Sequence, residues 1–162
     1  MARDQVNDFV TASAVPFSQY GALCWRMHRG KVQVLLATSR DTGRWIIPKG
    51  WPIDGLTPAQ TAAQEAWEEA GVEGKVGDAM IGQFTYDKIR AVRDPLPCAV
   101  SVFGLRVASL ADKFPERKQR RRKWFDACKA ARKVAEPDLR AILRQLDKAP
   151  ETLLPETARR GA

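Results

Sequence analysis

The segment from Thr57 to Gly71 constrains the fold most, because both ends of a helix are marked in it. Thr57 can cap the helix, Pro58 suits the first helical position, and Gln60 completes a capping box. Gly71 stands where a residue in the left-handed conformation ends a helix. The pattern therefore predicts a helix over residues 58–70.

Short apolar or alternating runs surround this helix and predict strands. The runs at 21–26 and 32–38 are joined at Gly30, which favours a hairpin. The remaining expected elements are strands at 45–47, 80–86, 99–107 and 124–125, a strand residue at Val76, and helices at 126–133 and 137–147. Strands, one early helix, more strands and then helices predict an α/β sandwich with a mixed β-sheet.

The length of 162 residues suits one domain. We expect that domain over 20–147, with an N-terminal extension over 1–19 and a C-terminal tail over 148–162. No apolar stretch approaches the roughly 18 residues that cross a bilayer, and the N-terminus lacks the order of a secretory signal. We therefore expect a cytoplasmic protein without a membrane partner. Three scattered cysteines argue against a disulfide framework or structural zinc.

Three carboxylates share one face of the predicted helix. Glu65, Glu68 and Glu69 fall within roughly 100° of one another around the helix axis. Like charges at this spacing repel, so the arrangement stabilises the helix only where cations meet it. One interpretation is a solvated acidic face. The other is a site for a divalent cation, since Mg²⁺ binds carboxylate oxygens together with water and substrate phosphates.

Residues 50–72 resemble the Nudix box, whose pattern is Gly, five residues, Glu, seven residues, then Arg-Glu-aliphatic-any-Glu-Glu-any-Gly-aliphatic. The matching residues are Gly50 and the run Gln64-Glu65-Ala66-Trp67-Glu68-Glu69-Ala70-Gly71-Val72. Two positions depart from the pattern, because Leu56 replaces the first Glu and Gln64 replaces the Arg. The family's Arg orients a glutamate by a charge-assisted fork, whereas Gln64 offers a neutral amide. Asp54 is near enough in sequence to replace the carboxylate that is missing at position 56.

The resemblance implies a Nudix-type α/β/α sandwich with a mixed β-sheet and a metal site. It implies that Mg²⁺ or Mn²⁺ is held by Glu65, Glu68, Glu69 and the Gly50 carbonyl, with Glu65 and Glu68 as the candidate catalytic residues. Metal ions at such a site neutralise a pyrophosphate and lower the pKa of the attacking water. Which glutamate acts as the general base stays open.

Further segments resemble the diphosphoinositol polyphosphate phosphohydrolase branch of the family. They are Ser39-Arg40, Arg44-Trp45-Ile46-Ile47-Pro48 and the late Arg122-Lys123-Trp124-Phe125. The resemblance covers roughly residues 20–147. It implies a polyphosphorylated small molecule as the substrate.

A basic run over 113–125 carries seven Lys and Arg residues and one Glu, in a chain of formal net charge +8. Basic runs are often solvated loops, but such a surface also attracts polyanions. We expect the phosphates of the substrate to be bound by Ser39, Arg40, Lys49, Arg120, Arg121, Arg122 and Lys123. Glu116, inside the run, either tempers this charge or reaches the metal ions. RNA is the alternative polyanionic partner, although no aromatic residues for base stacking interrupt the run.

With the resemblance, these features predict a metal-dependent hydrolase that cleaves a phosphoanhydride. The resemblance implies a diphosphoinositol polyphosphate or a dinucleoside polyphosphate as its substrate. One alternative is an RNA 5′-pyrophosphohydrolase. Another is a non-catalytic module whose altered box holds RNA or a polyphosphate. Release of phosphate with and without Mg²⁺ separates an enzyme from a binding module.

Overall fold

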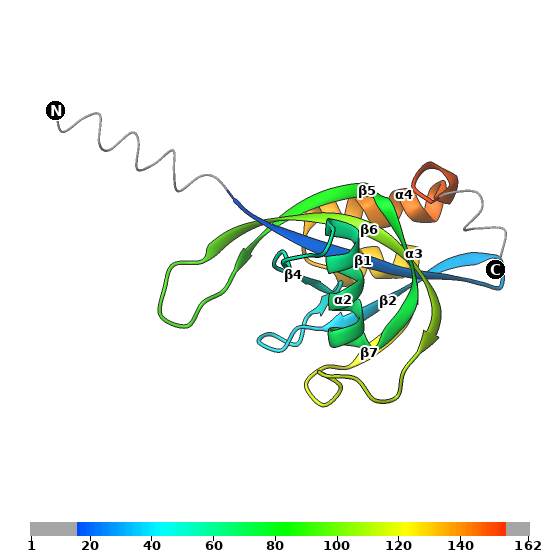
Figure 1. The fold of residues 1–162 in the computed structure, drawn as a ribbon. Helices are drawn as coiled ribbons and strands as arrows, with labels where there is room; N and C mark the ends of the chain where they lie inside the picture. The colour runs from blue at the N-terminus through cyan, green and yellow to red at the C-terminus, as the bar shows by residue number, and fades with distance from the viewer. Residues whose placement is uncertain (1–15, 155–162) are drawn as a thin grey trace.

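The computed structural model describes residues 16–154, which form a mixed sheet with helices on both faces (Figure 1). The strands are β1 (Phe17–His28), β2 (Lys31–Thr38), β3 (Trp45–Ile46), β4 (Lys49–Gly50), β5 (Val72–Lys88), β6 (Leu96–Leu110) and β7 (Arg122–Asp126). The helices are α2 (Pro58–Ala70), α3 (Ala127–Lys133) and α4 (Pro137–Lys148), followed by a 3-10 turn, η1 (Pro150–Thr152). The expected α/β/α sandwich is confirmed.

The order of strands places β1 in the middle of the sheet. The path runs β3-β2-β1-β6-β5, with β4 paired to β1 and β7 paired to β2. Strands β1 and β6 are parallel, and the other pairs are antiparallel. One edge of β1 pairs with two different strands, since residues 25–28 pair with β2 and residues 20–21 pair with β4. The sheet therefore divides along this edge, and the division positions the site described below.

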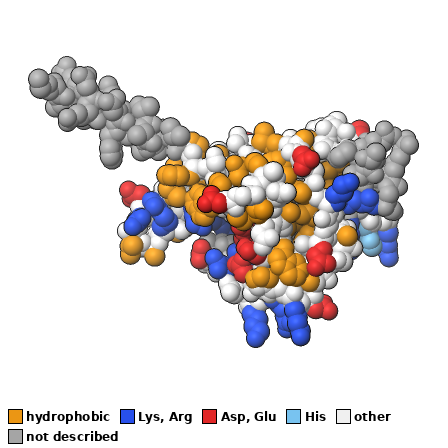
Figure 2. All heavy atoms as spheres, in the orientation of Figure 1, with side chains coloured by type: hydrophobic (Ala, Val, Ile, Leu, Met, Phe, Trp, Pro, Cys, Tyr) orange, Lys and Arg blue, Asp and Glu red, His pale blue; other side chains and the backbone are white. Residues whose placement is uncertain are grey.

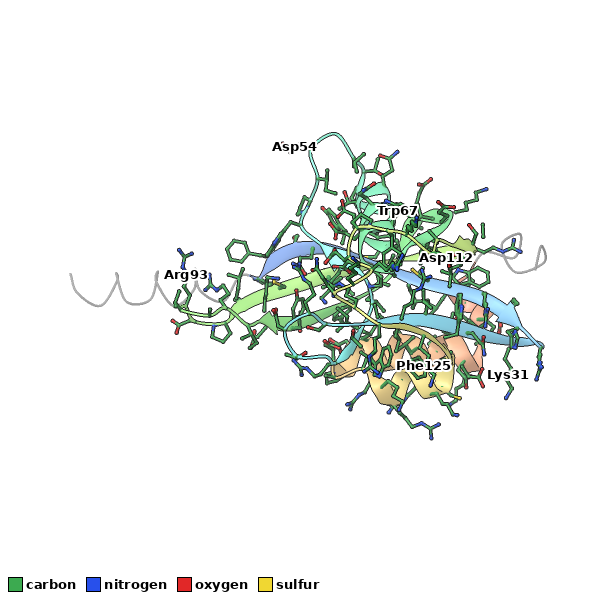
Figure 3. All side chains as sticks on the ribbon, turned by 90° about the horizontal axis from the view of Figure 1, so that it is seen from below. Lys31, Asp54, Trp67, Arg93, Asp112 and Phe125 are labelled. Carbon is green, nitrogen blue, oxygen red and sulfur yellow. The ribbon has the colours of Figure 1, made fainter. Side chains whose placement is uncertain are left out.

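Successive residues of β1 pack into opposite layers because side chains alternate across a strand. Leu23 and Trp25 pack in the layer of α3 and α4, whereas Ala22 and Cys24 pack in the layer of α2. Figure 3 shows the two layers, with Trp67 of α2 on one side of the sheet and Phe125 toward α3 on the other. The face of α2 in this layer consists of small residues, which let the helix approach the sheet closely.

The helix α2 has the bounds that the sequence predicts. The Thr57 side chain accepts a hydrogen bond from the Gln60 N–H, and the Gln60 side chain accepts one from the Thr57 N–H. Gly71 ends the helix in the left-handed conformation, with φ of 65°. The helix meets the sheet through buried Ala59, Ala62, Ala66 and Ala70.

The folded unit reaches beyond the expected limits of 20 and 147. Strand β1 begins at Phe17, and Leu154 is buried in the layer of α4. Strands β5 and β6 are also longer than expected, since they pair along their length with register shifts at Glu73, Val76 and Met80. The expected extension and tail otherwise lie outside the described residues. Within residues 16–154, no helix is both long and apolar enough to cross a membrane.

We predict that Gly71→Ala destabilises the protein more than Gly43→Ala. Both glycines have a positive φ, 65° and 68°, so an alanine at either position incurs a backbone penalty of about 1–2 kcal/mol. A methyl group at Gly43 would meet open space, whereas one at Gly71 would overlap the Phe114 ring and the Arg122 guanidinium. Urea unfolding of the two variants measures the difference, and equal losses would contradict the packing described for Gly71.

Candidate functional site

Strand β4 carries Gly50 to the side of α2, where the helix and the divided sheet meet. Gly50 pairs with Tyr20 of β1, which fixes its distance from the helix. A methyl group built on Gly50 would overlap the carboxylate of Glu65. This close approach requires glycine, and it brings Gly50 into contact with Glu65.

A cleft of about 530 Å³ opens at this junction. Its lining includes the carboxylates of Glu65, Glu68, Glu69 and Glu116 and the cationic side chains of Arg40, Arg44, Lys49, Lys88 and Arg120. Figure 2 shows Asp and Glu side chains gathered near the middle of the face that carries α2, with Lys and Arg side chains beside and below them. Opposite charges therefore share one concave surface, the pattern expected where cations and phosphates bind together.

Glu69 is the most enclosed of the box glutamates. The residue is only 6% exposed, so it does not lie on a solvated face, which corrects the first interpretation of the acidic cluster. Its Oε2 accepts a hydrogen bond from the Lys49 backbone N–H at 3.1 Å, and its Oε1 lies 3.3 Å from Nη2 of Arg120. The helix end and β4 are thus joined through a buried carboxylate.

Burial and mutual repulsion disfavour the charged form of Glu65 and Glu69 and so raise the pKa of both carboxylates. Burial raises the pKa of Glu69 to about 7, while Arg120 and Lys49 oppose that rise. Burial, followed by repulsion from Glu69 and Glu68, also raises the pKa of Glu65 to about 7. A cation bound among these groups would favour their charged forms.

The loop before β7 is tied to the box helix. The Glu116 backbone N–H donates to the Glu68 carbonyl at 3.0 Å, and this places the Glu116 side chain in the cleft wall. Arg120 lies 3.2 Å from Glu116 and 3.3 Å from Glu69, and Arg40 lies 3.4 Å from Glu116. Glu116 therefore reaches the cleft, and its contact with the metal ions stays a prediction.

The donor set fits a hard divalent cation. Carboxylate oxygens are the ligands that Mg²⁺ and Mn²⁺ prefer, and the Gly50 contact brings Glu65 against the backbone of β4. Within residues 16–154, no three acidic, His or Cys side chains are already converged on one point as a metal site. Glu69 and Glu68 already have partners here, since Arg120 contacts Glu69 and the Gln64 amide donates to Glu68 at 3.1 Å.

The structure divides the expected phosphate-binding residues into two groups. Ser39, Arg40, Lys49 and Arg120 line the cleft. Arg121, Arg122 and Lys123 are not part of its lining. Arg121 lies over the Trp45 ring at 5.7 Å, and Lys123 lies over the Phe125 ring at 5.3 Å.

Arg122 has a structural position instead. Its guanidinium donates to the Ala70 carbonyl at 2.6 Å and to the Ala111 carbonyl at 2.7 Å. A cationic donor at the last carbonyls of a helix satisfies groups that the helix leaves unpaired and complements its dipole. Arg122 thus caps the C-terminus of α2, which explains why it points away from the cleft.

The two altered box positions differ in their effects. Leu56 and Asp54 are both exposed and do not line the cleft, and Figure 3 shows Asp54 at the outer end of the loop before α2. Asp54 therefore does not replace the missing carboxylate. Gln64 remains in the site and donates to Oε1 of Glu68.

Several cleft residues carry no signal in the sequence. They are Tyr86, Lys88 and Glu136. Glu136 precedes α4, and its Oε2 is buried without a hydrogen-bond partner. A single Glu before a Pro resembles an ordinary helix start, so only the approach of the α3–α4 connection to the cleft reveals it.

We predict that the metal-free protein loses stability as the pH rises from about 4.5 to about 7. In this window the folded protein binds more protons than the unfolded chain, because the folded pKa values of Glu65 and Glu69 are raised from 4.5 to about 7. Glu69→Gln should flatten this slope, whereas Glu73→Gln, at an exposed site on β5, should not. Urea titrations in EDTA across this range measure it, and an unchanged slope in Glu69→Gln would contradict the burial of that charge.

Comparison with known proteins agrees with this geometry. The model of the NUDIX domain matches residues 18–146. Diphosphoinositol polyphosphate phosphohydrolase 3-alpha of Mus musculus is 34% identical over 105 residues, which cover 64% of this chain and 60% of that protein. Nudix hydrolase 12, mitochondrial, of Arabidopsis thaliana is 34% identical over 98 residues, which cover 59% and 48%. The chain thus spans about half to three fifths of the length of these relatives.

Solved structures share the fold at low sequence identity. A NUDIX hydrolase from Nitrosomonas europaea has a TM-score of 0.65 at 16% identity, covering 88% of this chain and 95% of that one. The Ap4A hydrolase of C. elegans has a TM-score of 0.57 at 20% identity, covering 82% and 96%. The NUDIX domain of Shewanella oneidensis NrtR, solved with ADP ribose, has a TM-score of 0.62 at 16% identity, covering 94% and 98%. The matching model, the box glutamates and the sandwich agree, and the chain belongs to the NUDIX family.

Proposed function

We propose that this protein is a metal-dependent hydrolase that cleaves a phosphoanhydride bond in a nucleoside or inositol polyphosphate. The observation that carries the proposal is the cleft in which the three box glutamates face cationic side chains from other elements. A phosphoanhydride substrate brings several negative charges next to the carboxylates, so both metal ions and basic side chains are needed to hold it.

Different residues of the cleft would bind the metal ions and the phosphates. Glu65, Glu68, Glu69 and the Gly50 carbonyl would hold Mg²⁺ or Mn²⁺. A divalent cation bound there supplies charge neutralisation of the pyrophosphate and a bound water of lowered pKa. Arg40, Arg44 and Lys88 lie in the cleft lining, where they can bind the phosphates that the metal does not contact. Glu65 and Glu68 are the candidate acceptors of the proton that the attacking water loses.

Lys49 has a different role from the exposed cations. Burial lowers the pKa of its ammonium group, while Glu69 and Glu136 oppose that shift. Its Nζ lies 4.8 Å from the centre of the Tyr86 ring, whose hydroxyl donates to Gln19 at 2.6 Å. This packing fixes the lysine on the cleft wall, so it would contact a phosphate with little loss of side-chain freedom.

Two features favour a dinucleoside polyphosphate over a diphosphoinositol polyphosphate. The indole of Trp51, next to Gly50, is 40% exposed while lining the cleft, and an aromatic surface there can stack on a base. The cleft lining also contains Asp41, Asp87 and Glu136 in addition to the metal-binding glutamates. These acids would repel a ring that carries phosphates on every side, whereas a linear polyphosphate can avoid them.

The names of curated relatives and of structural neighbours both support hydrolysis of a phosphoanhydride. The Mus musculus relative is named as a diphosphoinositol polyphosphate phosphohydrolase, and one structural neighbour is named as an Ap4A hydrolase. Another neighbour holds ADP ribose, which also contains a pyrophosphate. A phosphoanhydride is common to all of these ligands.

We predict that phosphoanhydride hydrolysis requires Mg²⁺ or Mn²⁺ and falls at least about 100-fold in Glu69→Gln, since a metal ligand that acts in the transition state is worth several kcal/mol. Glu69→Gln should not lower stability near pH 7.5, because the variant removes a buried charge. Glu73→Gln is the control that keeps the activity. Phosphate release by the purified protein over a panel of diphosphates measures both effects. Tight ligand binding without any turnover would instead support the non-catalytic module.

We predict that Trp51→Leu raises KM for dinucleoside polyphosphates about tenfold, since stacking on one base is worth about 1–3 kcal/mol. KM for diphosphoinositol polyphosphates should stay within about twofold, because they contain no base to stack. Trp51→Phe, which keeps an aromatic ring, should retain most of the affinity. Equal losses on both substrates would remove the stacking role. Preferred turnover of 5′-triphosphorylated RNA would favour the RNA pyrophosphohydrolase instead.

A further inference from the structure

Arg120 is an enclosed cation of the basic run. Its side chain is 7% exposed and contacts three different parts of the chain. Nη2 lies 3.3 Å from Oε1 of Glu69 and 3.2 Å from Oε1 of Glu116, while Nη1 donates to the Thr38 carbonyl at 3.1 Å. A planar guanidinium bound at both ends in this way has a fixed orientation.

The box itself provides no such cation. Gln64, at the position of the family's arginine, donates to Glu68 and offers only a neutral amide. The remaining support of the Glu69 carboxylate is the Lys49 backbone N–H on Oε2. Oε1 of Glu69 is therefore held by a side chain from outside the box, 51 positions further along the chain.

The loop that carries Arg120 is held in place on both sides of the cleft. The Arg121 N–H donates to Oγ1 of Thr38 at 2.9 Å, and the Thr38 N–H donates to the Arg121 carbonyl at 2.9 Å. On the helix side, the Glu116 N–H donates to the Glu68 carbonyl at 3.0 Å. These bonds connect the end of β2 with α2 through the loop. The backbone around Arg120 is therefore held in place where its side chain reaches Glu69.

We propose that Arg120 is the positioning residue for Glu69 and supplies from the β6–β7 loop the arginine that the Nudix box of this chain lacks. Its fork orients the Glu69 carboxylate in the cleft that contains the other box glutamates and links it to Glu116 of the β6–β7 loop. The role depends on geometry as well as on charge, because one guanidinium spans Thr38, Glu69 and Glu116. The inference rests on the proposed hydrolase function.

Kinetics of Arg120→Gln and Arg120→Lys test this role against simple phosphate binding. A residue that positions a metal ligand should change kcat, so both variants should lose at least about tenfold in kcat with KM within about threefold. Lysine should not rescue, because a point charge cannot make the three-way contact of the fork. Arg117→Gln, at an exposed arginine of the same loop, is the matched control for lost charge. A raised KM with unchanged kcat, or full activity in Arg120→Lys, would overturn the proposal.

Unfolding of the metal-free protein gives a second measurement that does not depend on turnover. Arg120→Gln should lower the midpoint of thermal unfolding, because Glu69 is left buried without its cation. Adding Glu69→Gln to that variant should restore several degrees, and the two changes should be clearly non-additive. Additive effects would overturn the contact.

The two measurements also separate this inference from the function it rests on. One outcome is that the variants unfold non-additively while the wild-type protein hydrolyses no diphosphate. That result would overturn the hydrolase proposal and leave the Arg120–Glu69 contact standing. An active wild type whose kcat is unaffected by Arg120→Gln would overturn the positioning role alone.

Discussion

The close approach of α2 to the divided edge of the sheet is the constraint on which the site depends. Alanines cover the helix face that meets the sheet, and Gly50 leaves room for Glu65 where β4 meets the helix. Larger residues on either surface would force the two apart, because packed interiors tolerate little added volume. The close approach that buries the alanines also buries Glu69, which lies on the adjacent face of the helix.

Burial of these carboxylates has an electrostatic cost, which other parts of the chain partly offset. Desolvation disfavours the charged form of Glu65 and Glu69, so both have raised pKa values. The Lys49 backbone and the Arg120 guanidinium partly compensate Glu69. A bound divalent cation would complete the compensation, which connects the folding of this region with its proposed chemistry.

The basic run shows how one charged segment serves several purposes. Arg120 turns into the cleft, Arg122 caps α2, and Arg121 and Lys123 lie over aromatic rings. Strand β7 separates Arg122 from Lys123, because successive residues of a strand point to opposite faces, whereas Arg120 and Arg121 lie in the loop before it. Net charge therefore predicted a polyanionic ligand but not which arginine would reach it.

The sequence by itself determined the helix α2, the box glutamates and the sandwich, since capping residues, helical spacing and strand alternation are local signals. It missed the full length of β5 and β6, because their ends depend on pairing with each other rather than on their own composition. Only the tertiary structure decided that Glu69 is buried, that Asp54 stays outside the cleft, and that Arg120 and Glu136 line it. Those outcomes depend on which loops meet across the divided sheet, and contacts between residues far apart in the chain leave no local pattern to read.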